Sequence, residues 1–240
     1  MNSEATPNSE PAFTLLKQSR NELVVFKPAG LSSERPGDGV SLKSLVAQRF
    51  PDCKPKLPHR LDRVTRGLLL VCLTPEAITF HNQQIQARRW EKYYLARVAT
   101  ASGQAPEQLV GAHKAFLTEV EGRAHIVHSG GKPSQLEILA AAPVPDRIDR
   151  FHLLIRLQTG RFHQIRIMCS ALGLPLPGDP LYDPAARDPA EFYLEHIILK
   201  YEDFDTRTRS TIFLRDYPER GAIAAKIETL LTDIAEEKGS

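Results

Sequence analysis

The sequence of 240 residues predicts an α+β fold in which flanking helices cover a mainly antiparallel, mixed sheet. Segments in the middle of the chain alternate apolar and polar residues, which is typical of strands with one buried face. Apolar residues at helical spacing occur between these segments only intermittently, and no composition shift marks a domain boundary. We therefore expect a disordered tail, rich in Ser, Pro, Asn and Glu, over residues 1–12 and a single domain over residues 13–240.

The first half of the chain alternates strand patterns with two helix patterns. Ser41 is placed to cap a helix that Pro51 ends, and Thr74 and Pro75 are typical of the first positions of another helix. The apolar run between these helices predicts a buried strand. The expected elements are two strands within residues 13–30, a helix at 40–50, and strands at 68–73 and 91–98 on either side of a helix at 75–90.

The second half of the chain predicts more strands. Apolar residues spaced i, i+3, i+4 and i+7 from Ile165 to Leu172 predict one helix, which begins near Arg161 and ends at Gly173. A Pro-rich loop follows at 172–191. The remaining expected elements are strands at 116–120, 134–142, 151–157, 195–201 and 211–216 and a last amphipathic helix at 223–234.

Composition narrows the class of protein. Apolar residues make up 42% of the chain and charged residues 25%, an ordinary balance, and no apolar run approaches the roughly 20 residues of a membrane span. The first residues lack the basic start and apolar core of a signal peptide. Three cysteines without paired spacing argue against a disulfide framework and a zinc site. We expect a cytoplasmic protein without a membrane segment.

The positive residues are grouped, although the net charge of +2 does not by itself indicate a nucleic-acid partner. If the three groups converge in the fold, they form a cleft suited to a phosphate backbone. If they do not, each is a separate solvated face. The groups are five Lys or Arg residues within 54–66, then Arg88, Arg89, Lys92 and Arg97, and then the segment 160–166.

A single carboxylate stands out within the first basic group. Asp62 lies among Arg60, Arg63 and Arg66, directly before the apolar run of the 68–73 strand. One explanation is a salt-bridged turn where a loop enters a sheet. The other is that the chain holds an ionised carboxylate for chemistry, as a nucleophile or as a base.

Familiar metal and cofactor motifs are absent from the sequence. His125 and His128 lie near two glutamates, but their spacing resembles neither HExxH nor paired-cysteine sites, so surface or strand histidines are the simpler interpretation. The chain contains no GxSxG elbow, no Walker loop and no GxGxxG turn. We therefore expect a reaction that uses neither a cofactor nor a metal ion.

Four segments share their order and character with one enzyme family. They are "VVFKPAGL" (24–31), "HRLDRVTRGLLL" (59–70), "EKYYLARV" (91–98) and "TGRFHQIRIMCSALGLPLPGDPLYD" (159–183). These segments resemble the successive motifs of the RluA family of pseudouridine synthases. The resemblance implies the pseudouridine synthase catalytic fold and an RNA partner, rRNA or tRNA. It also implies a cofactor-free isomerisation, in which the N1–C1′ bond of a uridine breaks and the base is rejoined through C5.

The resemblance assigns three catalytic residues. Asp62 matches the family's catalytic carboxylate, and Arg166 matches its partner, whose planar fork suits a bidentate hold on a carboxylate. Whether Asp62 acts as a nucleophile or as a base stays open. Tyr94 matches the tyrosine of the family's "KxYLAxV" pattern, which is expected to stack on the target uracil and is a candidate to move the C5 proton. The alternative for Tyr94 is a core tyrosine on an alternating strand.

Five further residues are expected to contact RNA. Arg60 matches the arginine that fills the gap left when the uridine is flipped out of its stack, with a plain phosphate contact as the alternative. His59 and His163 are expected to orient the site or to contact phosphates. Arg63 and Arg161 belong to the basic segments beside the motifs.

Three positions depart from the family's pattern. Arg66 stands where the family usually has a small hydroxyl residue, Met168 where it usually has histidine, and Glu195 in a "LEH" segment where it usually has "LHA". These departures put the RNA contacts in doubt and indicate a divergent branch. Only about 20 residues precede the first strand of the catalytic domain that the resemblance implies, so we expect a minimal member without an S4 domain, acting as a monomer.

Two alternative functions remain. The first is a catalytically inactive RNA-binding protein on the same fold, with Arg66 and Met168 as its signs. Against it, Asp62, Tyr94 and Arg166 are all present, and a chain kept only for binding does not need the carboxylate. The second is an Asp-dependent glycosidase. That chemistry usually needs two carboxylates about 5 to 10 Å apart, and Asp62 is the one acid that the motifs single out.

Overall fold

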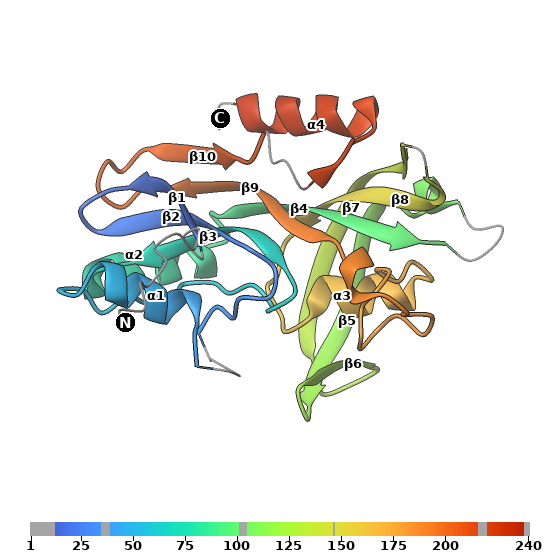
Figure 1. Ribbon diagram of the computed structural model, residues 1–240, viewed down its shortest axis with the longest axis horizontal. Coiled ribbons are helices and arrows are strands. Elements are labelled where there is room, and N and C mark those ends of the chain that lie inside the picture. The colour runs from blue at the N-terminus through green and yellow to red at the C-terminus, as the bar shows by residue number, and fades with distance from the viewer. Residues whose placement is uncertain (1–12, 35–38, 101–104, 146, 216–219, 238–240) are drawn as a thin grey trace, which may run out of the picture.

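The computed structural model describes residues 13–34, 39–100, 105–145, 147–215 and 220–237, and the expected tail over 1–12 lies outside them. Within the described residues, ten strands form one sheet in the order β1-β2-β3-β9-β4-β8-β7-β5-β6, and β10 pairs with β9 (Figure 1). Every pair is antiparallel except β3 with β9. The predicted α+β class with a mainly antiparallel, mixed sheet is confirmed.

The strands follow the alternating segments of the sequence, with some extensions. The three strands expected in the middle of the chain are all longer than predicted, and β6 was not expected. The strands are β1 (Thr14–Gln18), β2 (Glu22–Lys27), β3 (Arg66–Cys72), β4 (Glu91–Ala99), β5 (Gly111–Val120), β6 (Arg123–Val127), β7 (Lys132–Val144), β8 (Arg147–Leu157), β9 (Leu194–Glu202) and β10 (Arg209–Phe213).

Four α-helices and two short 3-10 helices lie in the described chain. The Ser41 side chain accepts the Ser44 N–H, and the Thr74 side chain accepts the Ala77 N–H, so both predicted N-caps are confirmed. The helices are α1 (Leu42–Arg49), α2 (Pro75–Gln86), α3 (Gln164–Ala171), α4 (Ala225–Glu236), η1 (Pro106–Leu109) and η2 (Pro189–Glu191).

Two helix ends differ from the prediction by three residues or more, and each lies next to or near a residue in the left-handed region. α2 ends at Gln86, four residues before the expected end at Trp90, and Arg88 has a φ of 56°. α3 begins at Gln164, three residues later than expected, because His163 has a φ of 51° and cannot continue a right-handed helix.

The sheet is buried on both faces. Figure 1 shows α1 and α3 on one side of the sheet and α4 on the other. The first core cluster joins α1 and α3 to alternate residues of the strands, Tyr94, Ala96 and Val98 of β4 among them. The second contains Tyr93 and Leu95 of the same strand together with residues of α4. The predicted shared face of Tyr94, Ala96 and Val98 is therefore confirmed, and we call it the Tyr94 face.

The parallel contact between β3 and β9 is short. It pairs Arg66 with Glu195 and Gly67 with His196, and β10 takes up the pairing with β9 further along. Gly67 has a φ of +116°, and a Cβ there would lie 2.4 Å from the carbonyl oxygen of His196. A side chain at residue 67 would therefore push these two strands apart, immediately after the Asp62 loop.

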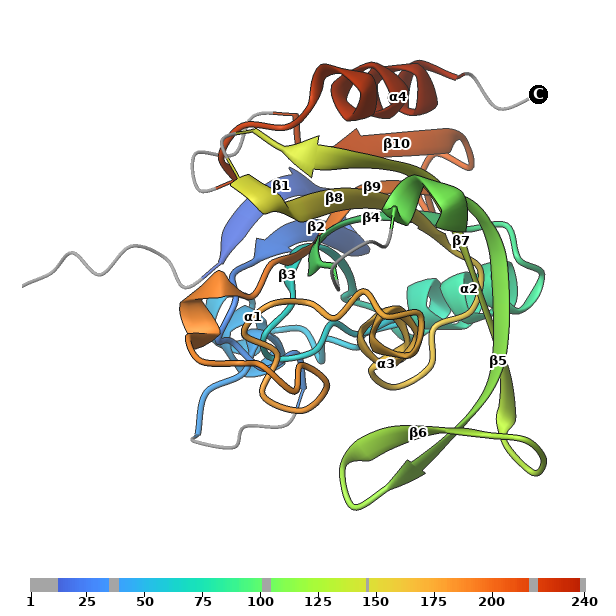
Figure 2. The same ribbon diagram turned by 90° about the vertical axis from the view of Figure 1, so that its right-hand side faces the viewer.

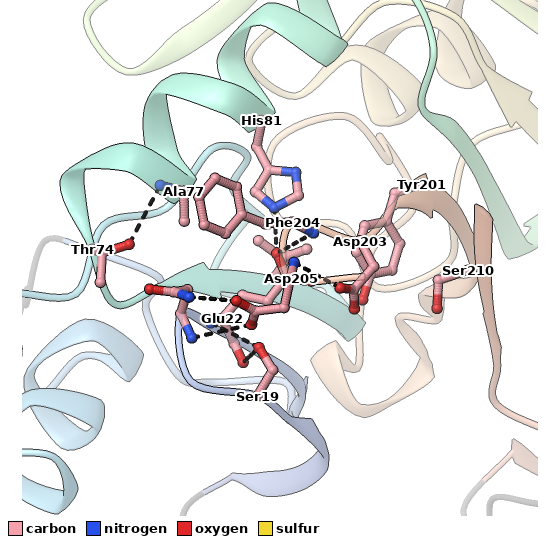
Figure 3. A network of polar contacts seen from close by, with 12 residues as sticks. Ser19, Glu22, Thr74, Ala77, His81, Tyr201, Asp203, Phe204, Asp205 and Ser210 are labelled. Carbon is pink, nitrogen blue, oxygen red and sulfur yellow. Dashed lines mark hydrogen bonds and ion pairs between the residues drawn. The ribbon is translucent and has the colours of Figure 1, made fainter. Parts of the chain in front are cut away.

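Buried polar contacts tie the turn between β9 and β10 to β2 and α2 (Figure 3). The Glu22 carboxylate lies 2.5 Å from His81 Nε2 and accepts the Phe204 N–H at 3.3 Å. Asp203 Oδ2 binds Lys17 Nζ at 2.6 Å, and its other carboxylate oxygen accepts the N–H groups of residues 205 and 206. These contacts give the turn a fixed backbone.

Two further features concern membrane spans and disulfide bonds. None of the helices in the part of the chain that the structure describes is long and apolar enough to cross a membrane. Cys53, Cys72 and Cys169 are all free thiols, so the predicted lack of a disulfide framework is confirmed.

Candidate active site

Asp62 lies in the loop that leads into β3, and the backbone on either side of it is anchored. The Ser33 hydroxyl donates to the Leu61 carbonyl oxygen at 2.7 Å, and the Gly30 N–H donates to the Arg63 carbonyl oxygen at 2.7 Å. Both partners belong to the segment that follows β2. The Asp62 side chain keeps 23% of its surface exposed, so a fixed loop presents a carboxylate that an outside molecule can reach.

Arg166 of α3 is the cation beside Asp62. Its Nη1 lies 3.3 Å from Asp62 Oδ2, while only 3% of its side chain is exposed. The predicted pairing of the two residues is therefore found. The α3 helix holds Arg166 through the packing of Ile165, Met168 and Cys169 into the first core cluster, so the guanidinium comes from a rigid element.

The bidentate hold expected on Asp62 is wrong, because the fork of Arg166 grips Asp179 instead. Arg166 Nε and Nη2 each lie 2.7 Å from an Asp179 carboxylate oxygen. Asp179 is fully buried and also accepts the N–H groups of Leu181 and Tyr182. Burial opposes the charge on Arg166, but Asp179, with a smaller effect from Asp62, raises the pKa of Arg166 above its ordinary value. Asp62 receives one N–H of a guanidinium that stays charged.

Asp179 was missed by the sequence reasoning. It stands in the "GDPLYD" segment, and the only signal for it was an aspartate inside an otherwise apolar, Pro-rich loop. Asp179 is also a second carboxylate near Asp62, since both bind the Arg166 guanidinium. Because Asp179 has no exposed surface, it cannot reach a sugar. Asp179 therefore cannot serve as the second carboxylate that a glycosidase needs.

Tyr94 of β4 lies close enough to Asp62 for the carboxylate to affect its titration. The side chain is buried, and its ring stacks on the His196 imidazole with centroids 4.6 Å apart and planes 13° apart. Burial, and then the charge of Asp62, raise the pKa of Tyr94 above its ordinary value. The hydroxyl is therefore a neutral phenol at physiological pH, and any role in proton transfer must pass through the neutral group.

His163 lies on the other side of the Asp62 carboxylate. Its Nε2 is 3.9 Å from Asp62 Oδ2, and its Nδ1 is 2.9 Å from the Tyr182 hydroxyl. That hydroxyl also accepts the N–H of Ala124, which belongs to the β5–β6 hairpin projecting from the body of the protein (Figure 2). Burial lowers the pKa of His163, although Asp62 raises it in part. A neutral imidazole with its proton on Nε2 satisfies this arrangement and faces Asp62 with a donor.

Lys27 is a further group near Asp62 that the sequence reasoning did not single out. It ends β2, has no exposed surface, and donates to the carbonyl oxygens of Pro28 and Leu31 at 2.9 and 2.8 Å. Burial lowers its pKa to about 7, against an opposing effect of Asp62. The signal for it was a lysine at the end of a wholly apolar strand, within the "VVFKPAGL" segment.

Two of the three departures from the family's pattern pair with each other. Arg66 Nε lies 3.1 Å from Glu195 Oε1, and Arg220 Nε lies 2.7 Å from Glu195 Oε2. The Arg66 guanidinium also lies over the rings of Phe26 and Tyr193, which belong to the second core cluster. Arg66 therefore points away from the Tyr94 face, and its positive charge is paired with the Glu195 carboxylate inside the protein.

Met168 and the histidine of the "LEH" segment both have defined places in the structure. Met168, the third departure, is buried in the first core cluster, where a thioether packs as a hydrophobe. A histidine does occur in the "LEH" segment, one residue after Glu195, and it is His196 that stacks on Tyr94. We find nothing in these positions that removes the carboxylate, the cation or the tyrosine.

The residues expected to contact RNA divide into two groups. Arg60 keeps 64% of its side chain exposed, with its Nη1 3.7 Å from a Glu34 carboxylate oxygen. Arg63 and Arg161 are exposed and donate to backbone carbonyl oxygens. His59, in contrast, turns inward: its Nε2 accepts the Leu70 N–H at 3.0 Å, and the ring packs between Trp90 and His196. Of the two roles expected for His59, orienting the site fits this position and a phosphate contact does not.

The three basic groups do not converge. Segments 54–66 and 160–166 meet through Asp62 and Arg166. In the other group, Lys92 is buried on the Tyr94 face, with a pKa that burial lowers to about 8. Arg88 and Arg89 line a separate cavity described below. Neither of the two alternatives holds as stated, because two of the basic groups meet at Asp62 and the third does not join them as a whole.

The part of the chain that the structure describes contains no group of three His, Cys, Asp or Glu side chains that could hold a metal ion. The polar atoms around Asp62 are mainly nitrogen atoms of Arg, Lys and His side chains. The charged Arg and Lys side chains have no lone pair with which to bind a metal ion. The absence of a cofactor and of a metal ion from the reaction stays a prediction.

Known proteins resemble the chain over most of its length. Residues 21–171 match the family model described as RNA pseudouridylate synthase. The dual-specificity RNA pseudouridine synthase RluA of Escherichia coli K12 is 34% identical over 193 residues, which cover 79% of this chain and 86% of that protein. The ribosomal large subunit pseudouridine synthase D of Pseudomonas aeruginosa is 30% identical over 221 residues, which cover 86% of this chain and 65% of that protein.

Solved structures share the fold. Human RNA pseudouridylate synthase domain containing 1 superposes with a TM-score of 0.66 at 26% identity and covers 88% of this chain and 86% of that one. Human RNA pseudouridylate synthase domain containing 4 gives a TM-score of 0.67 at 16% identity, over 86% of this chain and 89% of that one. Sequence and fold agree: the chain belongs to the RluA family of RNA pseudouridine synthases, isomerases that act on RNA.

Proposed function

We propose that this enzyme converts specific uridines in structured rRNA or tRNA to pseudouridine, with Asp62 as the catalytic carboxylate. The observation that carries this proposal is the contrast between Asp62 and its partner. Asp62 is partly exposed, whereas Arg166 is buried and held by Asp179. A guanidinium fixed by one carboxylate can donate to a second, reachable carboxylate without occupying all of its oxygen lone pairs.

The ionised carboxylate supplies the first step of the reaction. Asp62 either attacks C1′ of the target nucleotide or removes a proton from the sugar, and in both routes the N1–C1′ bond breaks and the uracil is released in place. The base then turns and C5 bonds to C1′, while Asp62 leaves C1′ or returns the sugar proton. C5 finally loses its proton and N1 gains one, so the reaction is an isomerisation. The geometry of Asp62 suits both routes, since one oxygen is held by Arg166 while part of the side chain remains open.

The reaction requires that the uridine leave its stack. A base within a helix cannot reach a carboxylate in a loop, so the nucleotide must be flipped toward Asp62. Arg60 supports this step, because its exposed side chain lies two residues before Asp62. In this proposal the Arg60 guanidinium occupies the space that the base leaves, while Arg63, Arg161 and His163 contact or orient the surrounding backbone.

Tyr94 holds the uracil and transfers its C5 proton in this proposal. Its ring is already stacked on His196, which fixes the orientation of the hydroxyl relative to Asp62. Because its pKa is raised, the hydroxyl is protonated before the step. Its oxygen takes the C5 proton as its own proton passes to water, while N1 takes up a proton, so no standing phenolate is needed. This assigns to Tyr94 the last step of the reaction and to Asp62 the first.

The names of the relatives support the substrate class. One is named for dual specificity toward RNA and another for the ribosomal large subunit. We therefore propose both rRNA and tRNA as targets of this enzyme. The proposal also includes a monomeric, cytoplasmic enzyme that needs neither a metal ion nor a cofactor.

Site-resolved pseudouridine mapping tests the proposal. Total RNA from cells with and without this protein is compared in parallel with RNA from cells that carry the Asp62→Asn variant. We expect at least one uridine that is modified only with the wild-type protein, and we expect the purified enzyme to modify it in EDTA. RNA that is bound but nowhere modified would instead indicate a catalytically inactive RNA-binding protein.

A further inference from the structure

A second basic site lies away from Asp62, at the end of the sheet where β4 begins and β9 ends. It is a cavity of about 790 Å³ lined by six cationic side chains and three carboxylates. We call it the arginine cavity. The cations are Arg88, Arg89, Arg156, Lys200, Arg207 and Arg209.

The cavity opens on the side of the sheet opposite Asp62. Glu91, which lines it, shares a face of β4 with Tyr93, and the Tyr93 hydroxyl donates to a Glu91 carboxylate oxygen at 2.6 Å. Arg156 is the cross-strand partner of Tyr93 on β8 and lies on the same face. Tyr94 projects from the other face. Glu91 precedes Tyr94 by three residues, so these two residues lie about 10 Å apart along the strand, and their side chains project from opposite faces of the sheet.

The carboxylates of the cavity leave part of its positive charge unbalanced. Glu91 pairs with Arg209 and with Arg156, and Glu237 pairs with Lys200. The three remaining cations, Arg88, Arg89 and Arg207, have no carboxylate partner among the described residues. Six positive side chains against three negative ones leave an excess of three positive charges.

The unpaired Arg207 is held in place rather than free in solvent. Its guanidinium lies 4.2 Å from the centre of the Phe80 ring and 4.5 Å from that of Phe204. The turn that carries it is the one fixed by Asp203 and Glu22 (Figure 3), and the Arg207 N–H donates to the Asp203 carbonyl oxygen at 2.9 Å. A stacked guanidinium on a fixed turn keeps its N–H donors available at little cost in side-chain entropy.

Unpaired, positioned arginines at the rim of an open cavity suit phosphate oxygens, because the guanidinium fork binds them in pairs. We propose that the arginine cavity binds a backbone phosphate of the RNA substrate, outside the nucleotides that reach Asp62. This inference rests on the proposed function, which supplies the RNA. Because the two sites lie on opposite faces of the sheet, an RNA that contacts both must turn around the end of the sheet where β4 begins, as a structured RNA can.

The test compares a double variant with a matched control. Arg88→Gln/Arg89→Gln removes two exposed charges of the cavity, and Arg20→Gln/Lys226→Gln removes two exposed charges that do not line it. Binding of bulk tRNA and of bulk rRNA is measured over a range of salt concentrations. We expect the cavity variant to bind about tenfold more weakly and to lose about 1.5 units of the slope of log K against log salt concentration. The control variant should keep the wild-type slope.

The outcomes separate the sources of phosphate and the two proposals. Equal slopes for the cavity variant and the wild type would overturn the RNA contact. If calorimetry then showed that inorganic phosphate binds the wild type and not the cavity variant, the site would belong to a free anion, and our proposal would be wrong. If no RNA is modified by the wild type but the slope still falls in the cavity variant, the proposed catalysis fails and the phosphate site stands.

Discussion

The Arg166 guanidinium binds two carboxylates that differ in exposure. Its fork is filled by Asp179, which is fully buried, and only Nη1 is directed at Asp62. If Asp62 is the catalytic carboxylate, as we propose, Asp179 acts on the reaction through Arg166 and is a positioning residue. Replacing it with asparagine leaves the charge next to Asp62 but removes one of the two oxygen acceptors that fix the direction of the guanidinium.

We expect Asp179→Asn to lower kcat by about 10- to 100-fold, because a small misplacement of a catalytic group has effects of this size, while KM changes little. Steady-state kinetics on the mapped RNA measure both constants. Asp183→Asn is the control, since Asp183 lies in the same loop and accepts the N–H groups of Gly178 and Ala185 without touching Arg166. Equal losses in the two variants would show that the loop, and not the Arg166 contact, is responsible.

Tyr94 allows stacking to be separated from proton transfer. Tyr94→Phe keeps the ring on His196 and removes only the hydroxyl, so glycosidic cleavage should continue while release of the C5 proton slows. The measurement is single-turnover kinetics on a short RNA that carries deuterium at C5 of the target uridine. Deuterium release at the wild-type rate would leave the hydroxyl no part in proton transfer, and Tyr94 would then serve only as a stacking platform.

At the scale of elements, the contact between β3 and β9 depends on a buried charge network. Glu195 is fully buried and binds both Arg66 and Arg220. Removing a cation and removing the anion have different effects on stability. If one cation is removed, Glu195 still has the other as a partner. If Glu195 is removed, two buried guanidinium groups lose their carboxylate. The network lies on the face of the sheet away from Tyr94.

This asymmetry predicts the order of two stability changes. Glu195→Gln should lower the free energy of unfolding by about 3 to 5 kcal/mol, and Arg66→Met by a smaller amount of about 1 to 3 kcal/mol. Urea denaturation of each variant gives both values. Since Arg66 points away from the Tyr94 face, Arg66→Met should keep the kcat of the wild type. A larger effect of Arg66→Met on stability, or a loss of its activity, would contradict this account.

The elements themselves were largely predictable, because hydrophobic periodicity and caps are local signals. Ser41 and Thr74 marked helix starts, and the alternation in β4 placed Tyr94 on the correct face. The strand β6 escaped prediction because its buried and exposed residues alternate weakly, with only Ala124 fully buried. The left-handed residues that shorten α2 and α3 also left no clear local signal in the sequence.

The sequence predicted the contact between Asp62 and Arg166 but not the other partners of these motifs. The motifs identified Asp62, Tyr94 and Arg166, but the partner of the Arg166 fork is 13 residues away, in an irregular loop. The pairing of Arg66 with Glu195 spans 129 residues and depends on the order of strands in the sheet. Single-sequence patterns carry no information on such distant contacts, so both partners could be found only in the fold.

At the scale of the whole molecule, buried histidines make the fold sensitive to acid. Burial, with nearby cations, lowers the pKa of His152 to about 4 and of His196 to about 3 and holds that of His59 well below its ordinary value. In the unfolded chain these groups titrate near 6.5. Between about pH 6.5 and pH 4 the unfolded chain therefore binds more protons, and stability is lost as the pH falls through this window.

We expect the urea midpoint to fall between pH 7 and pH 5, by an amount that corresponds to about 1 to 2 kcal/mol for each such histidine. His152→Phe removes one titrating group from the face of the sheet that bears the second core cluster, where the imidazole contacts the Tyr193 ring. This variant should show a smaller difference between the two pH values than the wild type does. Midpoints that are the same at pH 7 and pH 5 would contradict the burial of neutral histidines.

The role of Asp62 is tested most directly by one comparison on the mapped RNA. Single-turnover formation of pseudouridine is measured for the wild type and for Asp62→Asn, with the affinity of each for the same RNA measured in parallel. We predict that the variant keeps its fold and an affinity within a few-fold of the wild type, because the surrounding cations remain, and that it forms no pseudouridine. Turnover by Asp62→Asn at a rate near that of the wild type would contradict the account.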